Sequence, residues 1–357
     1  MGLKLNAGVT RNGIVLLVLA VLGYGTAMAG DTQGTSTAYH EATVANSGSR
    51  ATFKHKNWET EFTLTTGMRS DDLEWSIARN PAGSTPNVLS ELDWSNVESY
   101  QVTLVNRSRI ADHFYLRGAL NYAAIQDGSV RDSDYGQNDR TAEWSRSLSQ
   151  TNGDELWDVS AGCGYVFSLL DERLQLAPLV GFSYHKQNLR ITDGFQVISE
   201  DNPFSSSLQD NPPAVGPLPS TLNSSYFARW AGPWIGCDLR YLTARRDPDY
   251  LAMAFGLSLE LHLADYYGEG NWNLRGDLDH PKSFEHKADA LGISISADWR
   301  IAMASQWELI FSTTYQHWST GSGTDRKFLA DGGTATTHLN GVDWDSASVM
   351  AGAAYHF

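Results

Sequence analysis

Apolar and polar positions alternate along residues 286–300. Apolar side chains stand at every second position from Leu291 to Trp299, and smaller or polar residues stand between them. Because an extended chain points successive side chains to opposite sides, this pattern predicts a β-strand with one apolar and one polar face. The same period predicts about ten strands, over residues 58–64, 100–104, 114–122, 157–167, 174–184, 225–241, 255–263, 286–300, 307–318 and 349–357. Pro178 lies inside the fifth and has no N–H to donate, which predicts a bulge or local break there.

The connections between these strands alternate between long and short. The long ones cover residues 68–91, 125–154, 192–222, 267–285 and 319–340, and the short ones cover 106–111, 169–172, 243–249 and 302–306. A bacterial transmembrane barrel combines an even strand number, longer outer loops, short periplasmic turns and apolar-out, polar-in alternation. A secreted β-sandwich would also alternate, but it has no reason to sort its loops by end. We therefore predict an all-β fold, a closed antiparallel transmembrane β-barrel of about ten strands with long extracellular loops and short periplasmic turns.

The first residues have the pattern of an export signal. Lys4 and Arg11 flank the start of the chain, an apolar core covers residues 14–22, and Ala27-Met28-Ala29 offers a small-residue cleavage site. The apolar core is too short to cross the roughly 30 Å of hydrocarbon in a bilayer, which argues against a membrane anchor. We expect a signal peptide at residues 1–29, a flexible tail at 30–56 and the barrel at 57–357.

Composition and charge constrain the partners of the chain. The formal net charge is -15, and it becomes -17 without Lys4 and Arg11 of the predicted signal peptide. Such an acidic surface disfavours nucleic acid and attracts a cationic peptide or protein. The 12 Trp and 15 Tyr residues suit aromatic girdles at two membrane interfaces, although the core of a soluble sandwich would also use them. Cys163 and Cys237 fall on apolar faces of strands that are not neighbours, so we expect no disulfide.

Two of the predicted outer loops carry clusters of titratable residues. Asp132 and Asp134 lie in the second loop, and Asp277, Asp279 and His280 lie in the fourth. Carboxylates two positions apart share one face of an extended chain and can hold or polarise a water molecule. A carboxylate beside a histidine can orient the imidazole that takes a proton from this water. Together the two clusters would form a hydrolytic site without a protein nucleophile.

Simpler interpretations of the same clusters remain open. Asp-x-Asp pairs in polar loops are most often turn formers or solvated surface residues, and Asp279-His280-Pro281 is typical of a turn. Residues 132–139 also resemble a calcium-binding loop, although they lack the ordered EF-hand spacing and its closing glutamate.

Four short segments resemble the omptins, a family of ten-stranded outer-membrane endopeptidases of Gram-negative bacteria. They are Ser90-Glu91-Leu92-Asp93-Trp94, Asp132 to Tyr135, Gly232-Pro233-Trp234-Ile235-Gly236 and Tyr315-Gln316-His317, in the same order along residues 58–357. The resemblance implies the outer membrane of a Gram-negative bacterium as the location and omptin-like endopeptidase activity as the function. It also implies a cationic peptide or protein as substrate, no cofactor, and lipopolysaccharide as an activator.

The resemblance assigns roles to the two titratable clusters. Asp132 and Asp134 would polarise the attacking water, and an aspartate and a histidine of the fourth loop would take its proton. The sequence departs from the family pattern here, because no aspartate lies two positions before His280. Asp277 or Asp279 would then be the partner of this histidine.

Four further residues match omptin positions outside these clusters. Asp71 matches an acidic residue of the substrate cleft. Lys186, Arg229 and Lys287 match basic residues with which omptins bind lipopolysaccharide, and alternation places all three on the lipid-facing side near the outer strand ends. A cation that faces hydrocarbon is costly, so three at one rim indicate anionic headgroups, although long side chains can also snorkel to the interface.

The sequence thus supports two functions of different classes. The first is an omptin-like endopeptidase, and the second is a non-catalytic barrel that acts as an adhesin, a structural protein or a small pore. About ten strands leave a lumen largely filled by side chains, which disfavours a wide porin. Glu260 and His262 face this lumen, and we expect them to pair with each other or with residues such as Arg117.

Overall fold

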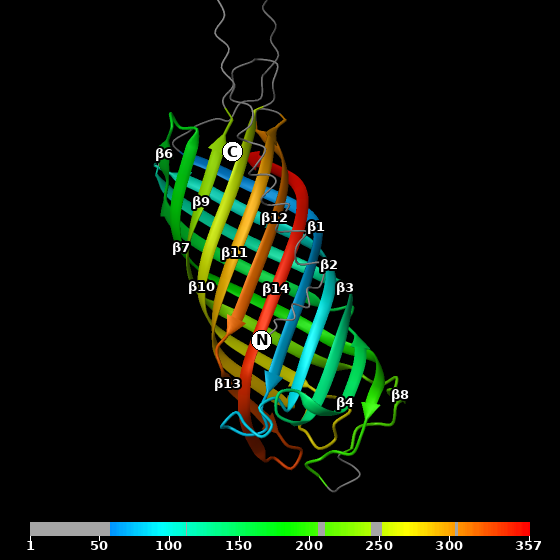
Figure 1. Ribbon diagram of the computed structural model, residues 1–357. Helices are drawn as coiled ribbons and strands as arrows, with labels where there is room; N and C mark the ends of the chain where they lie inside the picture. Colours follow the sequence, from blue (N-terminus) through cyan, green and yellow to red (C-terminus); the bar gives the residue numbers. More distant parts are fainter. Residues whose placement is uncertain (1–57, 112, 206–210, 244–251, 304–305) are drawn as a thin grey trace, which may run out of the picture.

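The chain forms one antiparallel sheet that closes into a tall barrel, as Figure 1 shows. This computed structural model describes residues 58–111, 113–205, 211–243, 252–303 and 306–357, so the predicted signal peptide and tail lie outside the described residues. β1 (Trp58–Ile77) pairs with β2 (Ser90–Ile110) on one side and with β14 (Thr334–His356) on the other, which closes the ring. The described residues contain no helix that is long and apolar enough to cross a membrane. The predicted all-β barrel is confirmed.

Several short elements combine into continuous wall strands. The other elements are β3 (Phe114–Gln137), β4 (Thr141–Gln150), β5 (Glu155–Tyr165), β6 (Phe167–Leu169), β7 (Leu174–Ser199), β8 (Gly216–Pro217), β9 (Ser224–Leu242), β10 (Met253–Asn271), β11 (Phe284–Ala302), β12 (Trp307–Thr320) and β13 (Gly323–Phe328). β4, β5 and β6 form one wall strand between β3 and β7, and β12 and β13 form another between β11 and β14. β8 adds a short pairing to the outer part of β7. With each group counted once, the described residues form the ten wall strands that alternation predicts.

The break predicted at Pro178 is found in the neighbouring wall strand, and β7 itself is continuous. Opposite Pro178, the partner of β7 changes, because β5 ends at Tyr165 and β6 begins at Phe167. Proline has no N–H to donate, so the ladder is interrupted at this point. On its other side, β7 pairs with β9 without a register shift.

The strands extend into the long outer connections that the sequence predicts. β3 reaches Gln137 and β4 begins at Thr141, so the predicted loop at residues 125–154 is mostly a hairpin. β7 reaches Ser199 and β10 reaches Asn271, inside two other predicted loops. The predicted loop boundaries are therefore wrong: only the outer connections at residues 78–89, 200–223 and 272–283 are long, whereas those at 138–140 and 329–333 are short turns. The C-terminus lies at the other end of the barrel (Figure 1).

The inner half of the barrel has the side-chain pattern of a membrane-spanning segment. On β1, Phe62 and Leu64 face outward and are 42% and 58% exposed, whereas Glu61 and Thr63 face the lumen and are buried. Other strands repeat this arrangement, with exposed Val102, Leu104, Leu259, Leu261 and Val349. Lipid accommodates apolar side chains and the lumen accommodates polar ones, so this half lies in the bilayer.

The outer half of the barrel reverses this polarity, although the odd-numbered positions of β1 face the interior throughout. On β1, the residues that follow Asp71 place Leu73 and Trp75 in the interior and Asp72 and Glu74 on the outer wall. A wall that is polar outside and apolar inside suits water on the outside. The barrel therefore extends beyond the membrane as a water-exposed wall around an apolar core.

Aromatic side chains fill the lumen of this outer half. Trp94, Trp230, Trp318 and Trp344 are fully buried, although they come from β2, β9, β12 and β14. The ring centroid of Trp344 lies 5.7 Å from that of Trp318 and 5.9 Å from that of Trp230, so these rings meet in the middle of the barrel. We call the following residues the outer aromatic core: Trp75, Trp94, Tyr226, Trp230, Tyr266, Phe284, Trp318 and Trp344.

Inward-facing glycines make room for two of the large rings. A Cβ atom on Gly181 would lie 2.3 Å from the indole of Trp234, and one on Gly292 would lie 2.4 Å from the indole of Trp318. Contacts this short mean that a side chain at either position would displace the tryptophan ring. The glycines thus let the neighbouring tryptophans lie against the barrel wall and occupy the lumen.

Candidate functional site

Asp132 and Asp134 lie together at the outer mouth of the barrel. They are on β3 rather than on a loop, and their cross-strand partners on β2 are Leu92 and Ser90. Leu92 belongs to the buried interior, and direct cross-strand partners share one face, so both carboxyl groups face the lumen above the outer aromatic core. The predicted shared face of the two carboxylates is therefore present, whereas their predicted place on a loop is wrong.

Burial and mutual repulsion perturb this aspartate pair. Burial raises the pKa of Asp132 well above its usual value, and the neighbouring charge of Asp134 raises it further. Burial also raises the pKa of Asp134, and hydrogen bonds from Ser90 and Ser145 oppose this rise. Both carboxyl groups therefore hold a proton more readily than a solvent-exposed aspartate does.

Cations face the aspartate pair from the opposite side of the mouth. The positive charges of Arg275, which follows β10, and of Lys327 on β13 lower the pKa of both aspartates and partly offset their burial. The guanidinium of Arg275 is also held by Asp277, with N–O distances of 2.7 and 2.6 Å. From the predicted fourth loop, a cation rather than an imidazole interacts with the pair.

His280 makes its contacts within its own loop. Its Nδ1 lies 2.9 Å from the amide oxygen of Asn271, and its Nε2 lies 3.2 Å from the carbonyl oxygen of Arg275. Its backbone N–H donates to Oδ1 of Asp279 at 2.8 Å. Among the described residues, no hydrogen bond or ion pair joins His280 to Asp132 or Asp134. The structure therefore brings the two aspartates together and leaves the predicted histidine engaged elsewhere.

Asp71 does not line an open cleft. It lies on β1 rather than on an outer loop, beneath the outer aromatic core, and only 3% of its surface is exposed. One carboxylate oxygen accepts from Arg69 at 2.8 Å, and the other accepts from Arg69 at 3.0 Å and from the indole N–H of Trp344 at 2.8 Å. The expected role of Asp71 as a cleft residue is therefore corrected to that of a buried, fully paired ion.

The lumen below Asp71 is crossed by ion pairs. Arg69 also donates to Asp158 on β5 at 2.6 Å, and His185 on β7 lies 3.0 Å from the other oxygen of Asp158. Lower in the barrel, Arg117 on β3 reaches Asp238 on β9 and Glu260 on β10, and His262 lies 3.2 Å from Glu260. The predicted interior pairing of Glu260, His262 and Arg117 is confirmed.

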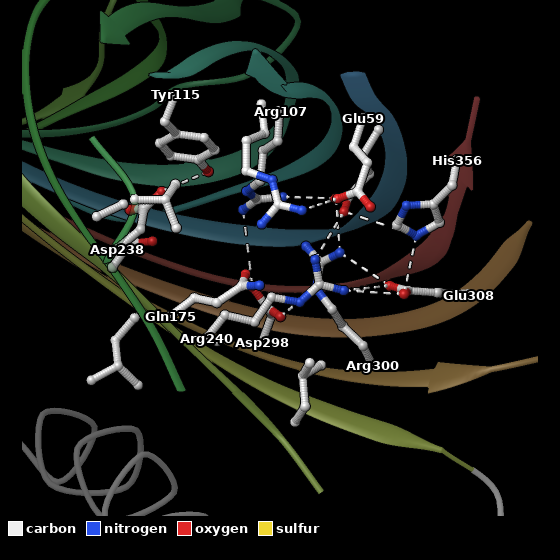
Figure 2. Close-up of a pocket in the computed structure, with 18 of the residues that line it drawn as sticks. Glu59, Arg107, Tyr115, Gln175, Asp238, Arg240, Asp298, Arg300, Glu308 and His356 are labelled. Atoms are coloured by element: carbon white, nitrogen blue, oxygen red, sulfur yellow. Dashed lines mark hydrogen bonds and ion pairs between the residues drawn. The ribbon is translucent and has the colours of Figure 1, made fainter. Parts of the chain in front are cut away.

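A cavity of about 120 Å³ opens at the inner mouth, and Figure 2 shows that arginines converge on carboxylates there. The carboxylate of Glu61 on β1 lies 2.8 Å from Arg300, 3.2 Å from Arg107 and 3.5 Å from Arg240. The contact with Arg240 crosses the lumen, because this arginine comes from β9. Alternation along each strand shows that these residues face the lumen. It does not show which residues of different strands meet, so the sequence analysis missed this network.

Three side chains in this cavity that could bind a metal lie close together. Among the described residues, Glu61, Glu308 and His356 form a group whose ligand atoms lie within 4.8 Å of one another. However, Arg300 lies 2.8 Å from Glu61 and 3.2 Å from Glu308, and Arg240 lies 3.1 Å from Glu308. Arginines already neutralise the two carboxylates, so this group fits an ion-pair network rather than a metal centre.

Lys186, Arg229 and Lys287 lie in one row on the outer wall, which we call the cation row. Lys186 on β7 is the cross-strand partner of Arg229 on β9, and Tyr267 on β10 is the partner of both Arg229 and Lys287 on β11. The ring of Tyr267 lies 5.4 Å from the Arg229 guanidinium and 5.9 Å from the Lys287 ammonium group. Glu155 lies 3.9 Å from Lys186, and Glu285 lies 2.9 Å from Lys287. On β10 and β11, the exposed pair Asp265 and Asp289 lies between the row and the exposed apolar pair Leu263 and Leu291, so the row stands just outside the apolar band.

Comparison of the sequence with known families identifies one match over most of the chain. The model of the family described as "Pom: Protochlamydia outer membrane protein" matches residues 63–357. No curated protein sequence matches the chain.

Comparison of the structure finds outer-membrane barrels. The outer membrane protease OmpT from Escherichia coli superposes with a TM-score of 0.67 at 12% identity, over 84% of this chain and 97% of that one. The outer membrane protein OprG from Pseudomonas aeruginosa gives a TM-score of 0.34 at 10% identity, over 83% and 95% of the two chains. A Pseudomonas aeruginosa FadL homologue gives 0.24 at 11% identity, over 83% and 90%. At these identities the similarity to OmpT shows the fold alone.

Proposed function

This chain belongs to the Protochlamydia outer membrane protein family, and we propose that it is a non-catalytic outer-membrane barrel that binds lipopolysaccharide through its cation row. Its location in the outer membrane follows from the family and the barrel fold. The observation that carries the proposal is the outer aromatic core, which fills the lumen where a pore would have to open. The alternative roles of adhesin and structural protein fit the same closed scaffold.

Two further observations support a scaffold without peptidase activity. Asp71 is paired on both oxygens and buried, so it is not free to bind a cationic side chain of a substrate. Both ring nitrogens of His280 have partners in its own loop, so it is not placed to take a proton from a water held by Asp132 and Asp134.

Lipopolysaccharide binding is supported by the position and chemistry of the cation row. Lys186, Arg229 and Lys287 stand side by side on the outside of the barrel, just beyond the apolar band. Charge-assisted hydrogen bonds to phosphate are among the stronger polar contacts in proteins, so three neighbouring cations suit the phosphates of a lipid headgroup. In addition, Arg229 has an aromatic partner in Tyr267, and the ring orients its guanidinium along the wall.

Replacement of the three cations tests the proposal. The Lys186→Ala/Arg229→Ala/Lys287→Ala variant is expected to bind purified lipopolysaccharide at least tenfold more weakly, since a hydrogen bond to a charged group contributes about 1.5–3 kcal/mol. Native mass spectrometry of the refolded barrel with lipopolysaccharide and with its dephosphorylated form measures this difference. Arg190→Ala is the matched control, because Arg190 is an exposed cation farther out on the same strand. Equal binding by the triple variant and the wild type would rule the proposal out.

An omptin-like endopeptidase is the second candidate function, and the aspartate pair favours it. Asp132 and Asp134 lie on the same lumen-facing side of β3 at the outer mouth with raised pKa values, as a pair that polarises water would. This candidate requires cleavage of a cationic peptide in the presence of lipopolysaccharide and loss of cleavage in both Asp132→Ala and His280→Ala. The non-catalytic proposal expects no cleavage by the wild type, so measured turnover that both variants abolish would replace it.

A further inference from the structure

A large apolar hollow lies on the lipid-facing wall of the barrel. Its volume is about 1180 Å³, and we call it the furrow. One margin follows a continuous row of cross-strand partners from β5 to β12: Cys163, Val180, Ile235, Leu261, Ile293 and His317. Because strands tilt in a closed barrel, a row of partners runs obliquely around the wall. The furrow therefore climbs from the apolar band at β5 toward the polar outer wall at β12.

The furrow is hollow because small residues lie beside large ones. Ala161 and Cys163 line its end on β5. Phe182 on β7, Leu263 on β10 and Leu291 on β11 stand out from the wall along the rest of the furrow and are 55%, 63% and 63% exposed. The recess between them is lined mainly by apolar groups, which suits a hydrocarbon chain.

The furrow and the cation row run parallel on the same strands. On three strands a furrow residue is followed, toward the outer mouth, by a cation four positions away: Phe182 and Lys186 on β7, Pro233 and Arg229 on β9, and Leu291 and Lys287 on β11. An even spacing keeps both side chains on the outer face, and four residues of strand span about 13 Å. A ligand with an anionic head on the row would therefore place its apolar tail in the furrow.

We propose that the furrow binds an acyl chain of the lipopolysaccharide molecule whose phosphates contact the cation row. This proposal rests on the proposed function for the headgroup and adds a separate site for the tail. The two sites recognise different parts of one amphipathic ligand, charge at the row and hydrocarbon in the furrow. Lipid that merely surrounds the barrel would have no reason to select this recess over other parts of the apolar band.

The alkylation rates of the two native cysteines can show whether the furrow is occupied. Cys163 lines it, whereas Cys237 faces lipid on β9 outside it, and both thiols are free. Alkylation of the refolded barrel by N-ethylmaleimide in detergent, followed by peptide mass spectrometry, gives the rate at each thiol. Purified lipopolysaccharide is expected to slow the reaction of Cys163 severalfold and to leave Cys237 nearly unchanged. Fully deacylated lipopolysaccharide, which keeps its phosphates, is expected to slow neither.

The outcomes separate the furrow from the headgroup site. Phosphate-dependent binding of lipopolysaccharide without protection of Cys163 would overturn the furrow and leave the proposed function intact. Failure of phosphate-dependent binding itself would remove the proposed function. If lipopolysaccharide protected both cysteines equally, or if phosphatidylcholine protected Cys163 as well as lipopolysaccharide does, the protection would come from ordinary surrounding lipid. Either result would also overturn the furrow as a binding site.

A filled furrow provides a second test. Ala161→Phe places a ring in the recess and is expected to weaken binding of acylated lipopolysaccharide severalfold without changing binding of the deacylated form. Leu104→Phe is the control, because Leu104 faces lipid on β2 away from the furrow. Equal affinity of Ala161→Phe and Leu104→Phe for the acylated form would contradict the proposal.

Discussion

The free energy of unfolding of the Arg69→Leu variant is expected to fall by about 3–5 kcal/mol, since loss of one partner leaves buried charges uncompensated. Arg69 is 3% exposed and donates to Asp71 at 2.8 and 3.0 Å and to Asp158 at 2.6 Å. It joins β1 to β5 across the lumen, so both carboxylates would lose their cation at once. Urea unfolding from phospholipid vesicles, followed by tryptophan fluorescence, measures the change.

Two comparisons show whether the effect comes from buried charge. Arg69→Lys keeps the charge but cannot make the same paired contacts to Asp71, so its stability is expected to fall between those of the wild type and Arg69→Leu. Arg131→Leu removes an outer-wall guanidinium that is 45% exposed and paired with Asp93, and it is expected to cost less than about 1 kcal/mol. If Arg69→Leu were no less stable than Arg131→Leu, the buried network would not hold the barrel together.

Truncation of Trp344 to alanine is expected to cost about 3–5 kcal/mol, as is usual for a large ring removed from a packed core. Its side chain is fully buried, packs on Trp318 and Trp230, and donates to Asp71. The same unfolding measurement applies. Trp299→Ala is the control, because Trp299 faces lipid and is 38% exposed. Similar losses for the two variants would mean that the outer aromatic core does not add stability beyond ordinary surface packing.

The membrane-spanning half of the fold was predictable because two different environments keep its alternation clear. Phe62 and Leu64 face lipid, and Glu61 and Thr63 face the polar lumen, so the alternation of apolar and polar residues identifies both faces of the strand. The extension of the strands beyond the membrane was missed because the polarity reverses there. In residues 73–77 the apolar side chains still recur at every second position, but they now occupy the inward-facing positions. A search for apolar residues at the outward-facing positions alone therefore takes this segment for a loop.

The candidate site was predictable only in part, and the limit is physical. The shared face of Asp132 and Asp134 follows from strand geometry, because residues two apart point the same way. The contacts of His280 depend instead on how its loop folds around Asn271 and Arg275, and no spacing rule gives that path. Asp71 was misplaced for a similar reason, since its partners Arg69 and Trp344 come from different parts of the chain.

The electrical conductance of the wild-type barrel in a planar lipid bilayer tests most directly whether the outer aromatic core closes the lumen. Refolding is verified beforehand by heat-modifiable migration on a denaturing gel. Because rings from β2, β9, β12 and β14 meet inside the outer half, the refolded barrel is expected to insert without producing current steps. Sustained stepwise current through the wild-type protein would contradict a closed lumen and, with it, the account of this barrel as a solid scaffold.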